Sequence, residues 1–321
     1  MQNNQSQAPA QQGNGQTTAV SERRVSPKVE LLKSVLNAPS VQEQFTNVLK
    51  DHKDAFVTSI IDLYNSDSQL QACNPNQVVA EALKAATMNL PINRALGFAY
   101  IVVFNNSVKQ PDGTWVKVPT PTFVPGYKGY IQLAMRTGQY RTINADFVYE
   151  GEVRKVNKLT GEIAFDGERT SDKIAGYFCY FELLNGFAKT LYMTVHDMAA
   201  YAKRYSPSVK KETTIEQLEK LANSSVVSKK VGWEGNFNDM ALKTVIRRLL
   251  SKYGYLSIEM QGAMSADDDT MGNREMVLDG ANAQVINIDT TFEPVNTGTA
   301  QVQSTIPAPA PGEEPTDGPG Y

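Results

Sequence analysis

The spacing of apolar residues changes twice along the chain, and this change constrains the fold most. From about residue 27 to 90, apolar residues recur every three or four positions, which is typical of amphipathic helices. From 97 to 194, β-branched and aromatic residues fill short runs between turn signals, which is typical of strands. Helical spacing returns between 196 and 254. Helices, strands and helices in this order predict an α+β domain.

Two pairs of strand-like runs predict β-hairpins. The runs GFAYIVVFNNSV and TWVKVPTPTFVP flank the turn signal Pro111-Asp112-Gly113, and a later pair turns at Asn185-Gly186. We therefore expect a mostly antiparallel sheet with β-hairpins packed on helices.

Composition divides the chain into three segments. Residues 1–26 are rich in Gln, Asn and Ser and are expected to be a disordered tail, and 27–258 form the core. Residues 259–321 are acidic and are expected to be largely disordered, with AQVINIDT (283–290) as the one segment that orders locally.

The chain is acidic as a whole, but its first 258 residues are basic. The net charge is -3, but 259–321 carry eleven acidic residues against one basic residue, a net of -10. Residues 1–258 carry 30 basic and 23 acidic residues, a net of +7. A basic body with an acidic tail is compatible with binding of nucleic acid.

Several other classes lack their sequence signals. The N-terminus has no apolar signal-peptide core, and no apolar run reaches the ~18 residues of a membrane span, so we expect a protein of the cytoplasm with no membrane partner. Two cysteines and two histidines in no ligand spacing argue against a zinc site.

Signals for hydrolytic chemistry are weak. The chain has neither a Gly-x-x-x-x-Gly-Lys-Ser/Thr loop nor a Gly-x-Gly-x-x-Gly motif, so we expect no ATP or other cofactor. The remaining alternative is a metal-dependent nuclease. Asp146, Glu150 and Glu152 lie an even number of positions apart, which would put them on one face of a regular strand.

The segment FVPGYKGYIQLAMRTGQYR (123–141) predicts a helix with a basic stripe. Pro125-Gly126 leads into it, and Gly138 ends it. Spacing of four places Lys128, Gln132 and Arg136 on one face. The opposite side carries Tyr127, Tyr130, Ile131 and Ala134, which suits packing against a sheet. Arg141 then starts a strand.

The helix at 236–253 also carries cations beside its apolar arc. Lys243 and Arg247 flank one edge, and Arg248 and Lys252 flank the other. One interpretation is a core helix whose long cations reach into water. The other is a contact with phosphates, since cations release counterions from nucleic acid and tyrosine rings stack on bases.

Two stretches resemble the RecT family of phage and prophage single-strand annealing recombinases. They are MNLPINRALGFAYIVVF (88–104), with Leu-Gly-x-Ala-Tyr, and the segment with Gly-Tyr-Lys-Gly-Tyr at 126–130. The resemblance spans residues 27–258. It implies the β-hairpin, sheet and helix core of the single-strand annealing protein superfamily.

The resemblance also implies the activity. Such proteins bind single-stranded DNA, oligomerise on it as rings or helical filaments, and pair it with its complement without ATP. They work beside a phage-type 5′-to-3′ exonuclease, and a host single-strand binding protein is a further possible partner. A passive coating protein, which binds the same DNA but slows pairing, remains an alternative, as does the nuclease.

The candidate DNA-binding residues are of three kinds. Cations form a phosphate clamp, glycines let the backbone approach a phosphate, and tyrosines stack on bases. They are Arg94, Lys117, Gly126, Tyr127, Lys128, Gly129, Tyr130, Arg136 and Arg141, with Lys243, Arg247 and Arg248 extending the groove.

The acidic tail has two interpretations. It is either a solubilising segment, or its carboxylates, such as Asp267-Asp268-Asp269, compete with DNA for the basic groove. Under the second interpretation, deletion of 260–321 tightens DNA binding at low salt.

Overall fold

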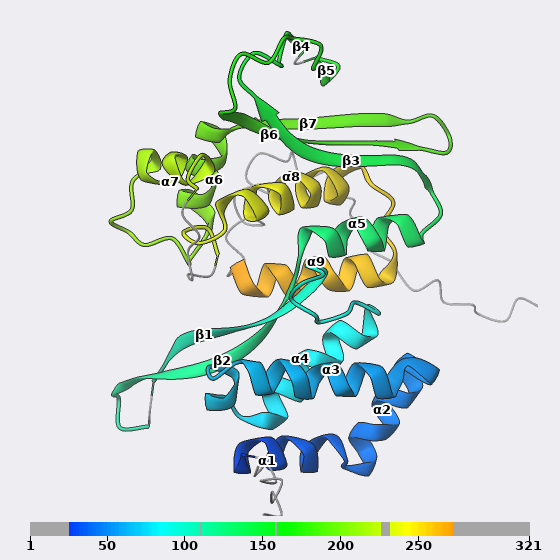
Figure 1. The fold of residues 1–321 in the computed structure, drawn as a ribbon, viewed down its shortest axis with the longest axis vertical. Coiled ribbons are helices and arrows are strands. Elements are labelled where there is room, and N and C mark those ends of the chain that lie inside the picture. Colours follow the sequence, from blue (N-terminus) through cyan, green and yellow to red (C-terminus); the bar gives the residue numbers. More distant parts are fainter. Residues whose placement is uncertain (1–25, 110, 158, 226–231, 272–321) are drawn as a thin grey trace, which may run out of the picture. The chain divides into compact units, whose positions relative to one another are not determined.

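The computed structural model describes residues 26–271 except 110, 158 and 226–231 (Figure 1). The expected tail at 1–25 and the segment at 283–290 lie outside the described residues.

The first part of the chain is helical, as predicted. Pro27, Pro39 and Pro75 begin three of its helices, where the missing N–H of proline costs nothing. Asn74 caps the last helix by accepting a hydrogen bond from Asn76 N at 2.9 Å. The elements are α1 (Pro27–Leu36), α2 (Pro39–Leu49), η1 (Lys50–His52), α3 (Lys53–Ser66), η2 (Leu70–Ala72) and α4 (Pro75–Thr87).

The expected first hairpin is confirmed. β1 (Ala99–Lys109) pairs antiparallel with β2 (Trp115–Pro125) in a register that runs from Ala99–Pro125 to Lys109–Trp115. Gly113 takes a φ of +86° in the turn. The inner half packs against α4 and α9, and Phe123 N donates to Glu81 Oε2 at 2.7 Å.

The remaining strands are antiparallel as expected, but they form separate sheets. β3 (Tyr140–Tyr149), β6 (Ile174–Leu183) and β7 (Ala188–Thr194) form a sheet in the order β3-β6-β7. β4 (Lys155–Asn157) and β5 (Glu162–Ala164) form a small hairpin. Gly186 makes the expected β6–β7 turn with a φ of +85°.

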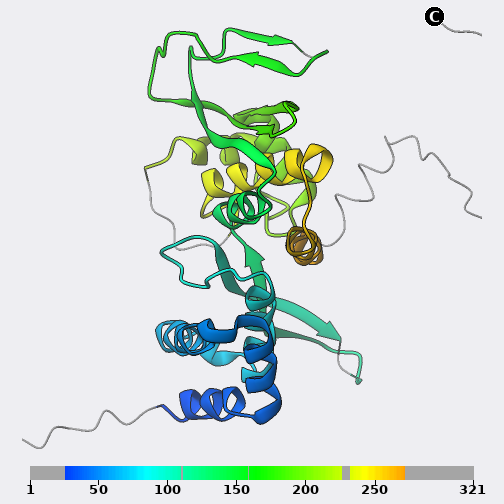
Figure 2. The same ribbon diagram turned by 90° about the vertical axis from the view of Figure 1, so that its right-hand side faces the viewer.

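Helices contact the three-stranded sheet or pack on the helices that do. They are α5 (Tyr127–Arg136), α6 (Val195–Tyr205), α7 (Ile215–Ala222), α8 (Phe237–Tyr253) and α9 (Ile258–Met271). α8 packs against all three strands and against α5, and it lies along the sheet in both ribbon views (Figures 1 and 2). In the described part of the chain, no helix has the length and hydropathy needed to cross a bilayer.

The ordered core extends beyond the predicted boundary at residue 258. α9 buries Met260, Ala263 and Met264, and it packs on α5 and β2. The prediction that 259–321 is largely disordered is therefore wrong for its first part. The prediction rested on the acidic composition of this segment, which also contains the apolar side chains that pack α9 against the core.

Two glycines bring α5 into backbone contact with the start of β1. A Cβ at Gly126 would lie 2.2 Å from Gly97 O, and a Cβ at Gly129 would lie 2.2 Å from Phe98 O. Gly126 N donates to Phe98 O at 2.9 Å. Both positions therefore require glycine, since backbone atoms cannot move aside as a flexible side chain can.

We predict that Gly129→Ala destabilises the fold by about 3 kcal/mol, the upper part of the range for overpacking, because the new methyl group overlaps a backbone carbonyl. Chemical denaturation measures the free energy of unfolding. Gly262→Ala is the control: its Cβ would meet only the flexible end of Met88 at 3.3 Å, and alanine favours the helix. Equal stability of the two variants would contradict the backbone contact.

Candidate nucleic-acid interface

The N-terminus of α5 presents a lysine among half-buried tyrosines. The Lys128 side chain is exposed, and its Nζ lies 5.8 Å from the centre of the Tyr127 ring. Its stem runs beside Gly97, where an added Cβ would lie 3.4 Å from Lys128 Cδ. The same Cβ would lie 3.1 Å from the Tyr100 hydroxyl. The two sequence motifs therefore meet at this point and place Tyr100, Tyr127 and Lys128 together.

A carboxylate from α8 completes this cluster. Burial raises the pKa of Asp239, and the Lys128 ammonium opposes that rise. The pKa values of Tyr100 and Tyr127 are also raised, first by burial and then by Asp239. Lys128 therefore lies near one negative charge, that of Asp239, while both side chains keep contact with solvent. We name Tyr100, Tyr127, Lys128 and Asp239 the α5 cluster.

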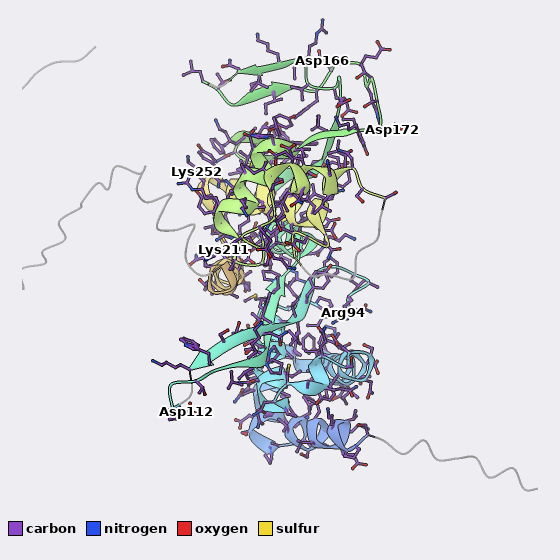
Figure 3. The ribbon with its side chains drawn as sticks, turned by 90° about the vertical axis from the view of Figure 1, so that its left-hand side faces the viewer. Arg94, Asp112, Asp166, Asp172, Lys211 and Lys252 are labelled. Atoms are coloured by element: carbon purple, nitrogen blue, oxygen red, sulfur yellow. The ribbon has the colours of Figure 1, made fainter. Side chains whose placement is uncertain are left out.

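The three candidate arginines near α5 all make structural contacts. Arg94 pairs with Asp67, and Arg141 pairs with Glu182 at 2.7 Å. Arg136 donates to Met88 O at 2.9 Å and to Asn89 O at 2.8 Å. The carbonyls carry no net charge, and Arg136 makes no ion pair within the described residues, although its charge contributes to lowering the pKa of Glu259 after the hydrogen bonds of that carboxylate. Arg94, at the surface in Figure 3, and Arg141 have their charges matched by a carboxylate.

Lys117 lies on the outer, exposed half of β2, opposite Ser107. Within the described residues it makes no ion pair. Lys117 and Lys128 are therefore the lysines among the candidates whose charge faces solvent.

The cations of α8 do not line an exposed groove. Lys243 is 4% exposed and pairs with Asp267 at 2.5 Å, and Arg247 pairs with Asp267 at 3.5 Å and with Asp268. This corrects the prediction for Lys243 and Arg247, because α9 covers the face of α8 that the sequence left open. Arg248 is half-buried, with its guanidinium 5.1 Å from the centre of the Tyr201 ring.

Tyr130 belongs to the same buried cluster. Its ring is fully buried, and its hydroxyl donates to Asp267 Oδ2 at 3.2 Å. Burial, and next the Asp267 charge, raise its pKa well above the usual value. The ring has no free face for a base, so the prediction of a stacking role is wrong for Tyr130 in this structure. Tyr127 keeps a partly exposed ring.

Gly126 and Gly129 also differ from the prediction. Their missing side chains make room for Gly97 O and Phe98 O of this chain, rather than for a phosphate.

The carboxylates of the nuclease alternative do not share a strand face. β3 ends at Tyr149 after an irregularity at Val148, so Glu150 and Glu152 lie in the following turn. Glu150 bonds Lys173 and Ser171, and Glu152 accepts from Tyr149 N at 2.8 Å. Among the residues that the structure describes, no three His, Cys, Asp or Glu side chains are placed to hold a metal ion. The prediction that these three carboxylates share one strand face, on which the nuclease alternative rested, is therefore wrong.

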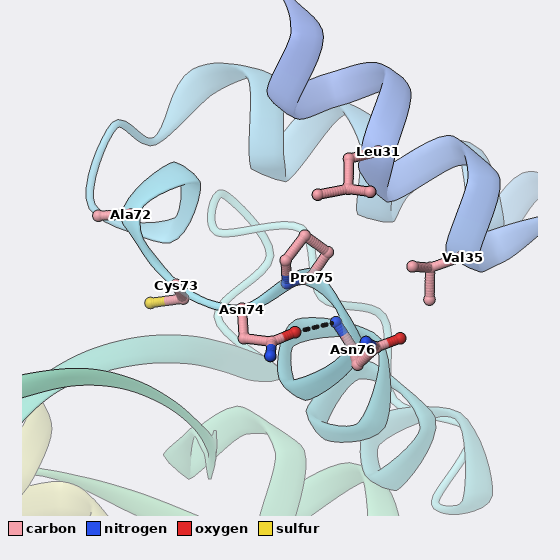
Figure 4. A pocket seen from close by; sticks show the side chains of 7 residues that line it. All are labelled: Leu31, Val35, Ala72, Cys73, Asn74, Pro75 and Asn76. Carbon is pink, nitrogen blue, oxygen red and sulfur yellow. Dashed lines mark hydrogen bonds between the residues drawn. The ribbon is translucent and has the colours of Figure 1, made fainter.

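A depression of about 450 Å³ lies between α1 and the start of α4 (Figure 4). Asn74, whose side chain caps α4, is among its polar residues. Its walls carry no charged group, so it adds nothing to a phosphate site; they are Leu31, Val35, Ala72, Cys73, Asn74, Pro75 and Asn76.

The fold and the interface together define a class of protein. An α+β core carries a solvent-facing lysine beside half-buried tyrosines at the N-terminus of α5 and a second exposed lysine on β2, and the three carboxylates that might have bound metal are separated or bonded elsewhere. These features are typical of a protein that binds nucleic acid.

The chain belongs to the RecT family, whose sequence profile it matches over residues 54–279. It is 38% identical to an uncharacterized protein of Bacillus subtilis (strain 168), YqaK, over 80% of this chain and 78% of the relative. It is 25% identical to Protein RecT of Escherichia coli (strain K12), over 79% of this chain and 84% of the relative. Membership implies single-stranded DNA binding and single-strand annealing in DNA recombination. The matched range includes α9, which the structure also places in the folded core.

Sequence reasoning missed Tyr100, Asp239 and Asp267 as parts of these clusters. Tyr100 stands inside the Leu-Gly-x-Ala-Tyr motif, which was a usable signal. Asp239 lies in the first turn of the helix at 236–253, where acidic residues are common for reasons unrelated to a binding site. Asp267 was assigned to the tail, although Met260, Ala263, Met264 and Asp267 follow the i, i+3, i+4, i+7 pattern of one helix face.

We predict that Asp267→Asn costs about 3–5 kcal/mol of stability, because Lys243 then keeps a buried charge without its carboxylate and Arg247 loses one of its two carboxylate partners. Urea denaturation measures the loss. The matched control is Asp172→Asn, which breaks an exposed pair with Arg169 (Asp172 is labelled in Figure 3) and should leave stability nearly unchanged. If both variants unfold at the same urea concentration, the buried cluster contributes little.

Proposed function

We propose that the protein anneals complementary single strands of DNA without hydrolysing a nucleotide, and that it does so as an oligomer, a ring or a helical filament. Family membership supports annealing. The observation that carries the proposal for this chain is the α5 cluster, where two interlocked motifs present the solvent-facing Lys128. Residues 1–271, which include α9, carry 30 basic and 27 acidic residues, and this net charge of +3 is compatible with a polyanionic ligand.

The mechanism follows from what the exposed residues can hold. Annealing requires that a strand is held by its phosphates while its Watson–Crick edges face a second strand. Lys128 and Arg136 bring charge to the phosphates, and the partly exposed ring of Tyr127 offers a face to a base. None of these groups reads a base edge, so binding is expected to be independent of sequence.

The assembly and partners are part of the proposal. Each subunit makes few contacts with DNA. When several joined subunits bind one strand, the affinity of the assembly for that strand rises although no subunit makes a new contact. We expect a phage-type 5′-to-3′ exonuclease to supply the strand, a host single-strand binding protein to compete for it, and the bacterial cytoplasm to be the place of action.

The test follows duplex formation between two labelled complementary oligonucleotides at limiting concentration, with no nucleotide present. We expect acceleration by the protein. Runs with magnesium and with a chelator establish any dependence on a divalent metal. Binding without acceleration would leave a passive coating protein, and shortened strands would revive the nuclease.

We predict that Lys128→Ala weakens binding to all single-stranded sequences alike and lowers the slope of log K against log salt by about 0.7, the value for one lost phosphate contact. Lys33→Ala, which removes an exposed lysine of α1, is the control and should leave the slope unchanged. Titrations at several salt concentrations measure both. An unchanged slope in Lys128→Ala would remove this residue from the DNA contact.

The structure changes how the tail should be tested. Deletion of 260–321 would remove the buried side chains of α9, so the deletion must begin at residue 272. Residues 272–321 carry seven acidic residues and one basic residue. If the tail competes with DNA, a chain ending at Met271 binds single strands more tightly at low salt while its thermal unfolding stays the same. Equal affinity would favour the solubilising interpretation.

A further inference from the structure

The outer half of the β1–β2 hairpin exposes a tryptophan that the α5 cluster does not use. Trp115 is 67% exposed, and its neighbours Val116 and Lys117 are exposed as well. Figure 3 shows Asp112 at the turn of this hairpin, beyond the half that packs against α4 and α9. Because the indole ring is exposed, it can stack on a planar group without giving up packing contacts in the core. It is also the largest apolar side chain on this surface.

The strand register places two lysines beside this indole. Lys109 is the direct cross-strand partner of Trp115, and Lys117 is the partner of Ser107. Residues paired across the ladder, and residues two apart on one strand, share a face, so Lys109, Trp115 and Lys117 lie together. By standard strand geometry, the Cβ of Lys109 lies about 5 Å from that of Trp115 across the ladder. The Cβ of Lys117 lies about 7 Å from that of Trp115 along the strand.

Neither lysine is neutralised by a described neighbour. No ion pair of Lys109 or Lys117 occurs among the residues described. The nearby carboxylate of Asp112 accepts from Thr114 N at 2.9 Å and from Thr114 Oγ1 at 2.7 Å. The face therefore combines an accessible ring with two unmatched positive charges.

We propose that this face binds single-stranded DNA, with Trp115 stacking on a base and with Lys109 and Lys117 contacting the flanking phosphates. The proposal rests on the proposed function and adds a second contact to it. Stacking on an aromatic ring suits any base, and ammonium groups suit any phosphate. A contact with a second subunit fits less well, because lysine is depleted in protein interfaces and two buried ammonium groups would need partners.

The hairpin contact is distinct from the α5 cluster. β2 runs from Trp115 to Pro125, directly before α5, and ten residues of strand span about 33 Å. The two sites therefore cannot hold the same nucleotide. One strand bound at both would be anchored at two points separated by several nucleotides.

Tryptophan fluorescence of the full-length protein tests the stacking. The chain has two tryptophans, and Trp233 is fully buried, so an exposed ring quenched by DNA is Trp115. We expect unlabelled poly(dT) oligonucleotide to quench the emission, and an oligonucleotide of the same length with abasic sites to quench it much less. Trp115→Phe should remove the quenching and keep most of the affinity.

Trp115→Ala should weaken binding about tenfold, within the range for one lost base stack. The control is Val116→Ala, which changes the neighbouring residue on the other face of the hairpin and should bind as the wild type does. Lys109→Ala and Lys117→Ala should each lower the salt slope by about 0.7.

Four results would overturn the inference. If the wild type binds and anneals DNA without quenching, or if Trp115→Ala anneals normally, the hairpin contact is wrong and the proposed function stands. If Trp115→Ala changes only the sedimentation of the DNA-free protein, the face is a contact between subunits. If the wild type does not bind single-stranded DNA at all, the proposed function fails with it.

Discussion

The backbone contact between the start of β1 and the N-terminus of α5 is the constraint on which the rest of the interface depends. Gly126 and Gly129 approach Gly97 O and Phe98 O so closely that no side chain fits between them. The β1–β2 register makes this contact possible, because it brings Pro125 back beside Ala99. The contact fixes Lys128 beside Tyr100. This explains physically why the two motifs, about 25 residues apart, occur together.

The second constraint is the buried charge cluster between α8 and α9. Asp267 forms ion pairs with Lys243 and Arg247 and accepts a hydrogen bond from the Tyr130 hydroxyl. Asp268 forms a second ion pair with Arg247. Desolvating these charges is costly, so the cluster stabilises the fold only while it is complete. It ties α9 to α8 and α5 with a defined register. It also removes two cations from the surface that DNA can reach.

The number of phosphate contacts available to one subunit is therefore smaller than the charge pattern suggests. Arg94 and Arg141 form ion pairs with carboxylates, while Lys117, Lys128 and Arg136 make no ion pair among the described residues. A few contacts per subunit give weak binding in isolation and strong binding when many subunits share a strand. The oligomer that we propose would bring many such contacts to one strand.

Much of the fold was predictable from local patterns, and much of the interface was not. The turns at Gly113 and Gly186 and the helix ending before Gly138 follow from local chemistry, and the structure has them as predicted. The partners of the charges depend on long-range packing. Lys243 and Asp267 are 24 residues apart, and helical spacing cannot show that α9 returns to cover α8. The irregularity at Val148 likewise breaks an alternation that the sequence left intact.

Lysine acylation, read by mass spectrometry with and without bound single-stranded DNA, tests the central claim most directly. The claim is that DNA is held by the solvent-facing Lys128 of the α5 cluster and not by the buried cations Lys243 and Arg247 of α8. The account predicts that Lys128 reacts in the free protein and is protected by DNA, and that Lys243 stays unreactive in both states. Labelling of Lys243 in the free protein, or equal labelling of Lys128 in both states, would contradict it.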